Sequence, residues 1–397
     1  MRVSSKSFQL QWLANFTSRQ VELADIQRQV STGKRVATAA DDPAGASQIV
    51  QLQDGLNRLE RYAANSDTAR RRLSLEESAL AEAGDLLDRV RELAIQAGGP
   101  TQTTQVRQAL ADEAREIRRN LLDLANAQDG EGRYLFAGNA VRNQPFTNAG
   151  GSVTYNGDDG TRSQRIGDNR VVSEGDPGSS VFSAIRSGNG TFTVAPAAGN
   201  TGTAIYSAAT VADASAWPTA SFTIAFTAPD AYEVRDGGGA VVQSGAFSTG
   251  DTISFAGIGV TVKGQPATGD EFQVAPSTYQ DVFTTVDRFI AAMESNLSDG
   301  ASRAQVQSAL NSSLLDLDQA LDHLSTVRSS VGSRLAVIAQ QGENNEDLGL
   351  QYTQTLSTVR DVDYARAISE LEQQLIGLEA AQKTFVRTRS FSLFNLI

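Results

Sequence analysis

The chain has 397 residues, of which 40% are hydrophobic, so it is long enough for two or three domains with buried cores. Its 34 basic and 46 acidic residues give a net charge of −12, which argues against nucleic acid as the main partner. There is no cysteine and a single histidine, His323, so a zinc site or a Ser-His-Asp triad would depend on that residue alone. We therefore expect no catalytic residue, no cofactor and no metal.

The sequence also lacks the signals of membrane insertion and of the general secretory route. No apolar run approaches the ~20 residues of a membrane span. The N-terminal stretch "MRVSSKSFQLQWLANF" has no continuous apolar core of the kind found in a cleaved signal peptide. We expect no membrane span, and export, if it occurs, by a route that does not use such a signal.

The first predicted helix ends in "STGKRVATAADDPAG". Its apolar face is formed by Leu13, Phe16, Leu23 and Val30. Gly33-Lys34 weakly resembles a phosphate loop, but the Walker motif needs a glycine where this chain has Arg28. Gly33 is a typical residue after a helix end, and Asp42-Pro43 is a typical helix start. The stretch is therefore predicted to be a loop between two helices rather than a ligand site.

A second and a third helix are predicted next. The second has apolar residues alternately three and four apart from Ile49 to Leu87, with Arg70, Glu77 and Gly84 as weak positions, and "GGP" at 98–100 ends it. The third runs from about Val106 to Leu124. The acidic pairs Glu76-Glu77 and 343–347, and His323, are expected on solvated helix faces. The basic triplet 70–72 is expected to form interhelical ion pairs.

Residues 141 to 276 are rich in Gly, Ser, Thr and Ala and show alternating apolar runs typical of strands. "YEVRDGGGAVVQ" and "VTYNGDDGTRSQRI" are each predicted to form a hairpin. This region is therefore expected to be a compact antiparallel β insert between two helical arms. The predicted fold class is α+β, with a long, discontinuous, coiled-coil-like bundle built by both arms.

The C-terminal arm repeats the helical pattern. Ser277 with Gln280, and Ser302 with Gln305, are predicted capping boxes. At ~1.5 Å per residue, a helix over 310–359 would be roughly 75 Å long. The apolar register shifts near 361–364, which predicts a break there. A last segment follows, with Ile368, Leu371, Leu375, Leu378 and Phe385.

The two terminal segments have few internal partners. Residues 1–40 contain six basic and two acidic residues, a net charge of +4, and residues 364–397 are also amphipathic and cationic. Such segments either stay disordered or fold against neighbouring copies. The second outcome would make them assembly elements.

Several stretches together carry a resemblance to a known family. "STGKRVATAADDPAG", "LSLEESAL", "GRYLFAGN" followed by "QPF", "LSTVRSSVGSRL", "DVDYARAISELEQQ" and "AAQKTFVRTRSFSLFNLI" occur in this order across both arms. In these stretches the chain resembles flagellar axial proteins of the flagellin family, and within them the hook-associated, hook-filament junction proteins of the FlgL type. The start "MRVSS" and the end "SLFNLI" favour this type over flagellin. The β insert carries no resemblance.

The resemblance implies a structural adaptor that joins the hook, through another hook-associated protein, to the flagellin filament by helical self-assembly. It implies type III export to the outside of the cell without a cleaved signal, and a chaperone at the C-terminal helix. We expect residues 1–45 and 360–397 to form an inner assembly domain, 46–140 and 277–359 a helical bundle, and 141–276 an outer β domain. A flagellin-like filament subunit, a secreted adhesin using the β insert and an enzyme in the outer domain remain alternatives.

Two sets of candidate residues follow, and neither is catalytic. The domain-joint candidates are Gly132, Arg133, Tyr134, Phe136 and Gly138. The assembly-interface candidates are Leu13, Phe16, Leu23, Val30, Gly33, Lys34, Arg35, Asp41, Asp42, Pro43, Ile368, Leu371, Leu375, Leu378, Phe385, Phe391, Leu393 and Phe394.

Overall fold

The computed structural model describes residues 5–99 and 103–390. Its contacts divide the chain into two compact units, one formed by Met1–Ala64 with Gln341–Ile397 and the other by Asn65–Gln340. Two long helices, α2 (Pro43–Ala97) and α6 (Gly300–Arg360), contribute residues to both units. The α+β fold class is confirmed, and within the described ranges no helix is long and apolar enough to cross a membrane.

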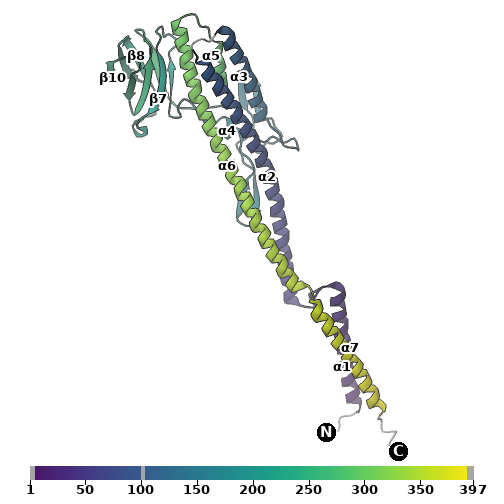
Figure 1. Ribbon diagram of the computed structural model, residues 1–397. Helices are drawn as coiled ribbons and strands as arrows, with labels where there is room; N and C mark the ends of the chain where they lie inside the picture. Colours follow the sequence, from purple (N-terminus) through teal and green to yellow (C-terminus); the bar gives the residue numbers. More distant parts are fainter. Residues whose placement is uncertain (1–4, 100–102, 391–397) are drawn as a thin grey trace, which may run out of the picture. The chain divides into compact units, whose positions relative to one another are not determined.

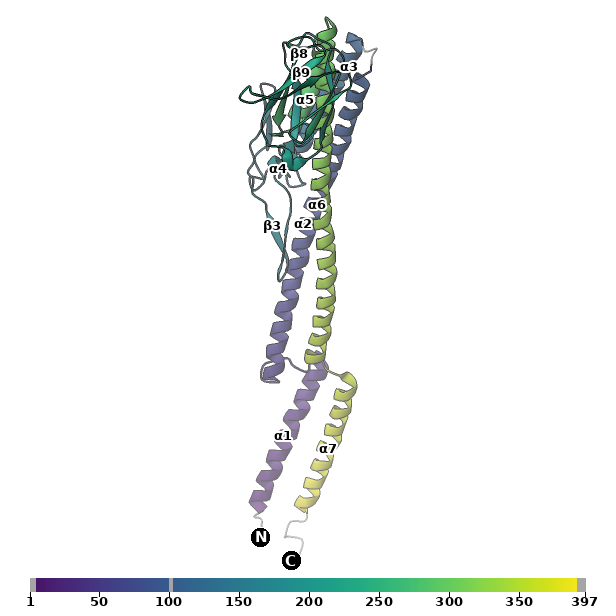
Figure 2. The same ribbon diagram turned by 90° about the vertical axis from the view of Figure 1, so that its left-hand side faces the viewer.

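The first unit contains two further helices, α1 (Ser5–Thr32) and α7 (Tyr364–Ser390). They lie side by side in both views (Figures 1 and 2). The predicted helix boundaries are confirmed here: α1 ends directly before Gly33, α2 begins at Pro43, and a break separates α6 from α7. The long helix predicted over 310–359 is also continuous, as part of α6.

The longer helices of the second unit are parts of α2 and α6 together with α3 (Thr104–Ala125) and α5 (Val282–Glu294), and α3 packs along α5. Figure 1 shows α2 and α6 running beside each other in this unit. The fully buried side chains of this core include Leu73, Leu80, Leu87 and Phe289. Amphipathic helices of this kind are stabilised mainly by burying one face against their neighbours.

The predicted register of α2 is wrong in part. The weak positions Arg70 and Gly84 lie outside the core, where Ala69 and Ala83 are buried instead. The predicted pattern steps by four residues from Ser66 to Arg70, whereas the buried face of the helix steps by three residues, from Ser66 to Ala69. The buried face is therefore a regular alternation of three and four that needs no charged weak position at 70.

Two helix starts also differ from prediction. Asp281, rather than Ser277 with Gln280, caps α5, because its side chain accepts a hydrogen bond from the Thr284 N–H at 2.7 Å. At the start of α6 the Asp299 carboxylate accepts from the Ser302 N–H at 2.8 Å. Aspartate fits both positions because its short side chain reaches the free N–H groups of the first turn.

The inserted region contains two principal antiparallel sheets. A five-stranded sheet has the order β10-β9-β8-β13-β6, and a three-stranded sheet has the order β11-β12-β7. Their inward side chains form a separate core that includes Phe192, Phe226 and Phe272. The strands are β6 (Phe192–Pro196), β7 (Ile205–Val211), β8 (Phe222–Ala228), β9 (Ala231–Asp236), β10 (Val241–Ala246), β11 (Thr252–Phe255), β12 (Ile258–Lys263) and β13 (Glu271–Pro276). A short 3-10 helix (Ala214–Ala216) lies between β7 and β8.

One predicted hairpin is confirmed and the other is wrong. β9 and β10 pair across the glycine turn of "YEVRDGGGAVVQ". The segment "VTYNGDDGTRSQRI" instead contributes to two hairpins. Its first strand, β2 (Ser152–Tyr155), pairs with β1 (Phe146–Ala149), and its last strand, β3 (Ser163–Gly167), pairs with β4 (Arg170–Ser173). The chain then forms a short helix, α4 (Gly178–Phe182), and a two-stranded sheet of β5 (Ile185–Arg186) with β14 (Tyr279–Gln280).

Candidate assembly interface and buried joint

Two loops of the first unit, one between α1 and α2 and one between α6 and α7, are joined by backbone hydrogen bonds. The Arg35 N–H donates to the carbonyl of Arg360 at 2.7 Å, and the Val362 N–H donates to the carbonyl of Gly33 at 3.0 Å. Lys34 and Asp361 form an antiparallel bridge between them. Because these bonds link the α1–α2 loop to the α6–α7 loop, the two loops form one structure, which we call the double joint.

Gly33 has φ +71°, which favours glycine, and its Cα faces the Tyr364 hydroxyl. The Asp42 carboxylate accepts from the Gly45 N–H at 2.9 Å and so caps α2, while Pro43 supplies the first helical residue. Residues 33–42 thus form a loop between two helices, as predicted.

Charged side chains hold the same loop in shape. The Asp41 carboxylate accepts from Arg28 at 2.7 Å and from the Thr38 N–H at 2.8 Å. Hydrogen bonding by Arg28 holds the pKa of Asp41 well below its ordinary value. Arg35 pairs with Asp42 at 3.4 Å and also donates to the Val359 carbonyl at 2.7 Å. Arg28 and Arg35, which flank the Gly33-Lys34 pair in the sequence, therefore bind groups of this chain.

The α1–α7 pair is held by half-buried side chains. Trp12 stacks on Phe385 with ring centroids 3.8 Å apart and on Phe16 with centroids 5.0 Å apart. Gln374 also donates to Glu22 across the pair at 3.2 Å. The predicted residues Leu23, Val30, Leu371 and Leu378 are half-buried. Phe391, Leu393 and Phe394 lie outside the described residues.

Other apolar side chains of this pair remain exposed. Leu13 is 53% exposed, and Ile368 and Leu375 are each 45% exposed. Sequence reasoning missed further members of this exposed set, which are Leu10, Val21, Ile376 and Val386. On α1, Leu10, Leu13 and Val21 recur at helical spacing on a face different from that of Trp12 and Phe16. Treating α1 as a helix with two apolar faces would have identified Leu10 and Val21.

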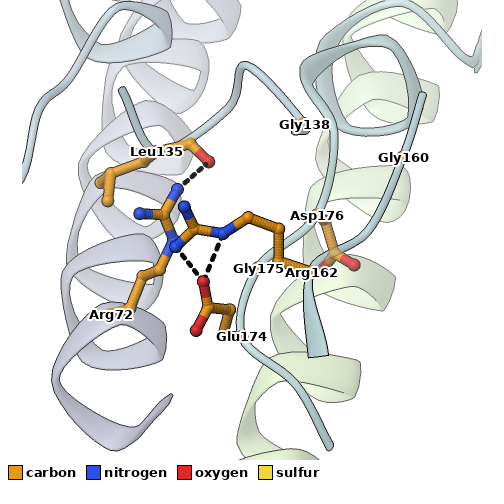
Figure 3. Close-up of a pocket in the computed structure, with 8 residues that line it drawn as sticks. All are labelled: Arg72, Leu135, Gly138, Gly160, Arg162, Glu174, Gly175 and Asp176. Carbon is orange, nitrogen blue, oxygen red and sulfur yellow. Dashed lines mark hydrogen bonds and ion pairs between the residues drawn. The ribbon is translucent and has the colours of Figure 1, made fainter. Parts of the chain in front are cut away.

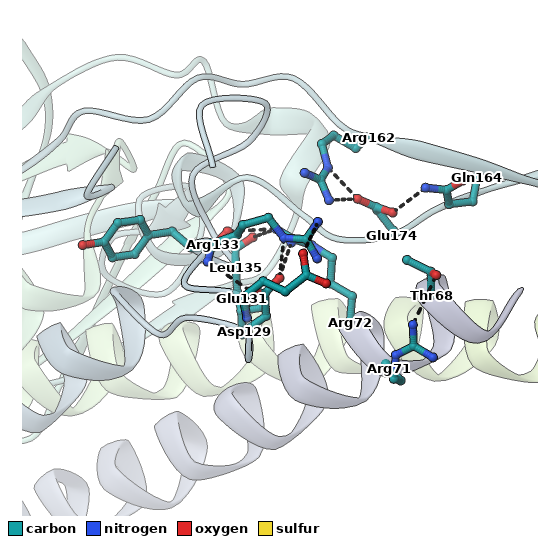
Figure 4. A network of polar contacts seen from close by, with 11 residues as sticks. Thr68, Arg71, Arg72, Asp129, Glu131, Arg133, Leu135, Arg162, Gln164 and Glu174 are labelled. Atoms are coloured by element: carbon teal, nitrogen blue, oxygen red, sulfur yellow. Dashed lines mark hydrogen bonds and ion pairs between the residues drawn. The ribbon is translucent and has the colours of Figure 1, made fainter. Parts of the chain in front are cut away.

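The joint candidates of the second unit form a buried polar cluster with α2. Arg72 is 6% exposed and donates to the Tyr134 carbonyl at 2.8 Å and to Asp129 at 3.4 Å (Figure 4). Asp129 also accepts from Arg133 at 2.8 Å. Burial lowers the pKa of Arg72, and the neighbouring charge of Arg162 adds to this effect. The loop 129–135 is thus fastened to α2 through one guanidinium group.

The remaining joint candidates shape the backbone around this cluster. Phe136 is fully buried and its ring packs edge-on against Phe182 at 5.0 Å. Gly132 and Gly138 have φ +73° and +64°. A Cβ added to Gly138 would lie 2.1 Å from the carbonyl oxygen of Asp158, so this position requires glycine for its lack of a side chain as well as for its φ.

A very small cavity of about 10 Å³ lies beside Arg72 and is lined by the residues of Figure 3. In it, Glu174 is 1% exposed and receives hydrogen bonds from Arg162 and Gln164. Burial opposes ionisation of Glu174, but these hydrogen bonds and the Arg162 charge outweigh burial and lower its pKa. The cavity has room for at most a water molecule, so it is a packing feature rather than a ligand site.

Several charged residues differ from prediction. Glu76 is 2% exposed rather than solvated, and Glu77 pairs with Arg328 at 2.8 Å. Arg70 pairs with Asp67 on its own helix rather than across helices. The His323 Nε2 lies 2.8 Å from the Ser180 carbonyl. Among the residues that the structure describes, no group of acids or histidines is arranged to hold a metal ion.

Comparison with known proteins identifies this architecture. A family profile described as the bacterial flagellin N-terminal helical region matches residues 3–141. Flagellar hook-associated protein 3 of Salmonella typhimurium is 25% identical over 397 residues, which is 100% of this chain and 99% of that protein. Long helical arms from both ends of the chain, together with the flagellin profile, define a flagellar axial protein.

Two solved structures narrow the class. The crystal structure of Xanthomonas campestris FlgL is 37% identical, with a TM-score of 0.73, over 77% of this chain and 99% of that one. The flagellar junction protein FlgL from Legionella pneumophila is 31% identical, with a TM-score of 0.71, over 80% of this chain and 100% of that one. The chain belongs to the FlgL (hook-associated protein 3) family of flagellar hook-filament junction proteins. It is a structural adaptor of the bacterial flagellum, and the predicted resemblance is confirmed.

Proposed function

We propose that this adaptor assembles through the α1–α7 pair, whose exposed apolar side chains pack against neighbouring subunits. The observation that carries this proposal is the set of large apolar residues left in water on both helices, including Leu13, Leu375 and Ile376. Fully burying a large apolar side chain contributes about 1.5–3 kcal/mol relative to full exposure, so covering these partly exposed side chains favours association. Of the assembly-interface residues predicted from the sequence, Leu13, Ile368 and Leu375 belong to this surface, and Gly33, Lys34, Arg35, Asp41 and Asp42 belong to the double joint.

Copies of this chain are the first neighbours we propose, arranged as a helical ring. A neighbouring hook-associated protein would lie on one side of the ring and flagellin on the other, as the family assignment supports. One chain must then meet unlike neighbours. We propose that the double joint lets one chain adapt to unlike neighbours, because short loops separate α1 from α2 and α6 from α7 there.

The domain boundaries and the route of the protein are also part of the proposal. We assign 1–45 and 360–397 to the inner assembly domain, 46–140 and 277–359 to the bundle, and 141–276 to an outer β domain that carries no catalysis. Export to the cell exterior would use the flagellar type III apparatus without a cleaved signal, with a chaperone on the C-terminal helix. The family assignment supports this route.

Charge substitution on α7 tests the assembly proposal. Ile376→Asp places a carboxylate at a side chain that is 68% exposed in the single chain, so the isolated protein should fold normally. In cells that lack their own copy, we expect hooks without attached filaments, seen by electron microscopy. Gln373→Asp is the matched control, because it introduces the same charge on an exposed residue of the same helix that is already polar. Filaments on hooks that carry Ile376→Asp would contradict the proposal.

A further inference from the structure

The buried carboxyl of Glu76 has no function in the assembly described above. Glu76 occupies a core position of α2, between the fully buried Leu73 and Leu80, and is itself 2% exposed. Its Oε1 accepts a hydrogen bond from the Asp176 N–H at 3.1 Å. Its Oε2 is buried and has no hydrogen-bond partner. An ionised carboxylate is costly in such a place, whereas the neutral acid is much less so.

The charges around Glu76 are already paired with one another. Arg334 of α6 binds the Asp176 carboxylate, and Arg162 binds Glu174. Arg72, one turn earlier on α2, binds Asp129 and the carbonyls of the loop that follows it. The charged groups that act on Glu76 are Asp176 on the connecting segment and Arg334 on α6, and Arg72 of α2 lies beside the same Gly175 backbone.

The segment 174–178 leads from the end of β4 to the first residue of α4 and packs against Glu76. The Gly175 backbone lies against the acid: a Cβ added there would be 3.4 Å from the Glu76 Oε2 and 3.6 Å from the Arg72 Nε. The Gly178 N–H donates to the Phe136 carbonyl at 2.8 Å. A change in the charge of Glu76 therefore acts directly on the backbone of this segment.

We propose that Glu76, Asp176 and Arg334 form a proton-dependent latch that fastens the segment 174–178 to α2 and α6. While Glu76 carries its proton the latch is closed, and the segment packs against a neutral group. When the proton leaves to water, the site holds two carboxylates, on Glu76 and Asp176, and one guanidinium, on Arg334. The segment then opens more often, because opening allows water to reach the Glu76 carboxylate.

The direction of the pH effect follows from linkage. Burial, followed by repulsion from Asp176, raises the pKa of Glu76 from 4.5 to about 8, although Arg334 acts in the opposite direction. Between these two values the closed state retains a proton that the open state has released, so rising pH favours opening. The closing equilibrium falls by up to about tenfold per pH unit in this window and becomes constant above it.

Hydrogen exchange of the full chain tests the latch at pH 6 and pH 8, after correction for intrinsic rates. In peptides that cover 174–178, we expect wild-type protection to fall by up to about 50-fold relative to Glu76→Gln, since pH 6 lies inside the window and pH 8 at its upper end. Glu82→Gln, which removes an equal charge from an exposed face of α2, should follow wild type. An equal pH dependence in wild type and Glu76→Gln would overturn the proposal.

A second measurement needs no variant and so does not depend on the folding of Glu76→Gln. Infrared difference spectra of the wild-type protein should show the C=O band of a buried, protonated carboxyl at pH 6. That band should disappear by pH 9.5. Its absence at pH 6, or its persistence at pH 9.5, would contradict protonation of Glu76 as the closed state.

Discussion

The α1–α7 pair and the α2 face of the second unit share apolar spacings of three and four residues but bury them to different extents. Leu80 on α2 is fully buried, whereas Leu13 on α1 is 53% exposed. The helix bundle and the loop 129–139 surround α2, while α1 packs mainly on α7. The same pattern thus produces a buried core in one unit and leaves large apolar side chains exposed in the other.

The largest expected effect is the loss of a large side chain from the buried core. Leu80→Ala should lower the free energy of unfolding by about 2–5 kcal/mol, because the neighbouring helices cannot close the cavity. Denaturant unfolding followed by circular dichroism measures this change. A loss below about 1 kcal/mol would mean that this core adjusts as freely as the α1–α7 surface.

Glycine positions sharpen the comparison at an intermediate scale. Gly138→Ala places a methyl group 2.1 Å from a backbone carbonyl, whereas Gly33→Ala meets the terminal hydroxyl of Tyr364 at 2.9 Å, which can move aside. Both substitutions incur the cost of positive φ, about 1–2 kcal/mol. We expect Gly138→Ala to lower the free energy of unfolding by at least about 1 kcal/mol more than Gly33→Ala does, because the backbone at 138 must move. Thermal unfolding of the two variants provides the measurement, and equal losses would refute this difference in rigidity.

The smallest expected effect is at the exposed face of α1. Leu13→Ala should change the stability of the isolated chain by less than about 0.5 kcal/mol, since the side chain is already largely in water. The same denaturation experiment measures it beside Leu80→Ala. A loss comparable to that of Leu80→Ala would show that Leu13 is buried within the single chain, which removes it from the proposed interface.

Local signals in the sequence were sufficient for the end of α1, the start of α2 and one hairpin, but not for the caps of α5 and α6. Gly33 and Asp42-Pro43 mark boundaries through φ preference and capping, and both depend on neighbours in the chain. The β9–β10 hairpin is likewise set by its own turn. The burial of Glu76 and the partner strands of β2 and β3 could not be predicted in this way. Burial of Glu76 depends on residues near 176 and 334, and strand pairing depends on which partner satisfies the backbone.

The backbone bonds of the double joint have a mechanical consequence. The Arg35–Arg360 and Gly33–Val362 hydrogen bonds connect the α1–α2 loop to the α6–α7 loop. A pull along α1 is therefore shared with the end of α6 through several bonds strained in parallel, instead of being borne by the loop 33–42 alone. The bonds between the two loops must break before the loops can separate, so tension on either loop is also carried by the other.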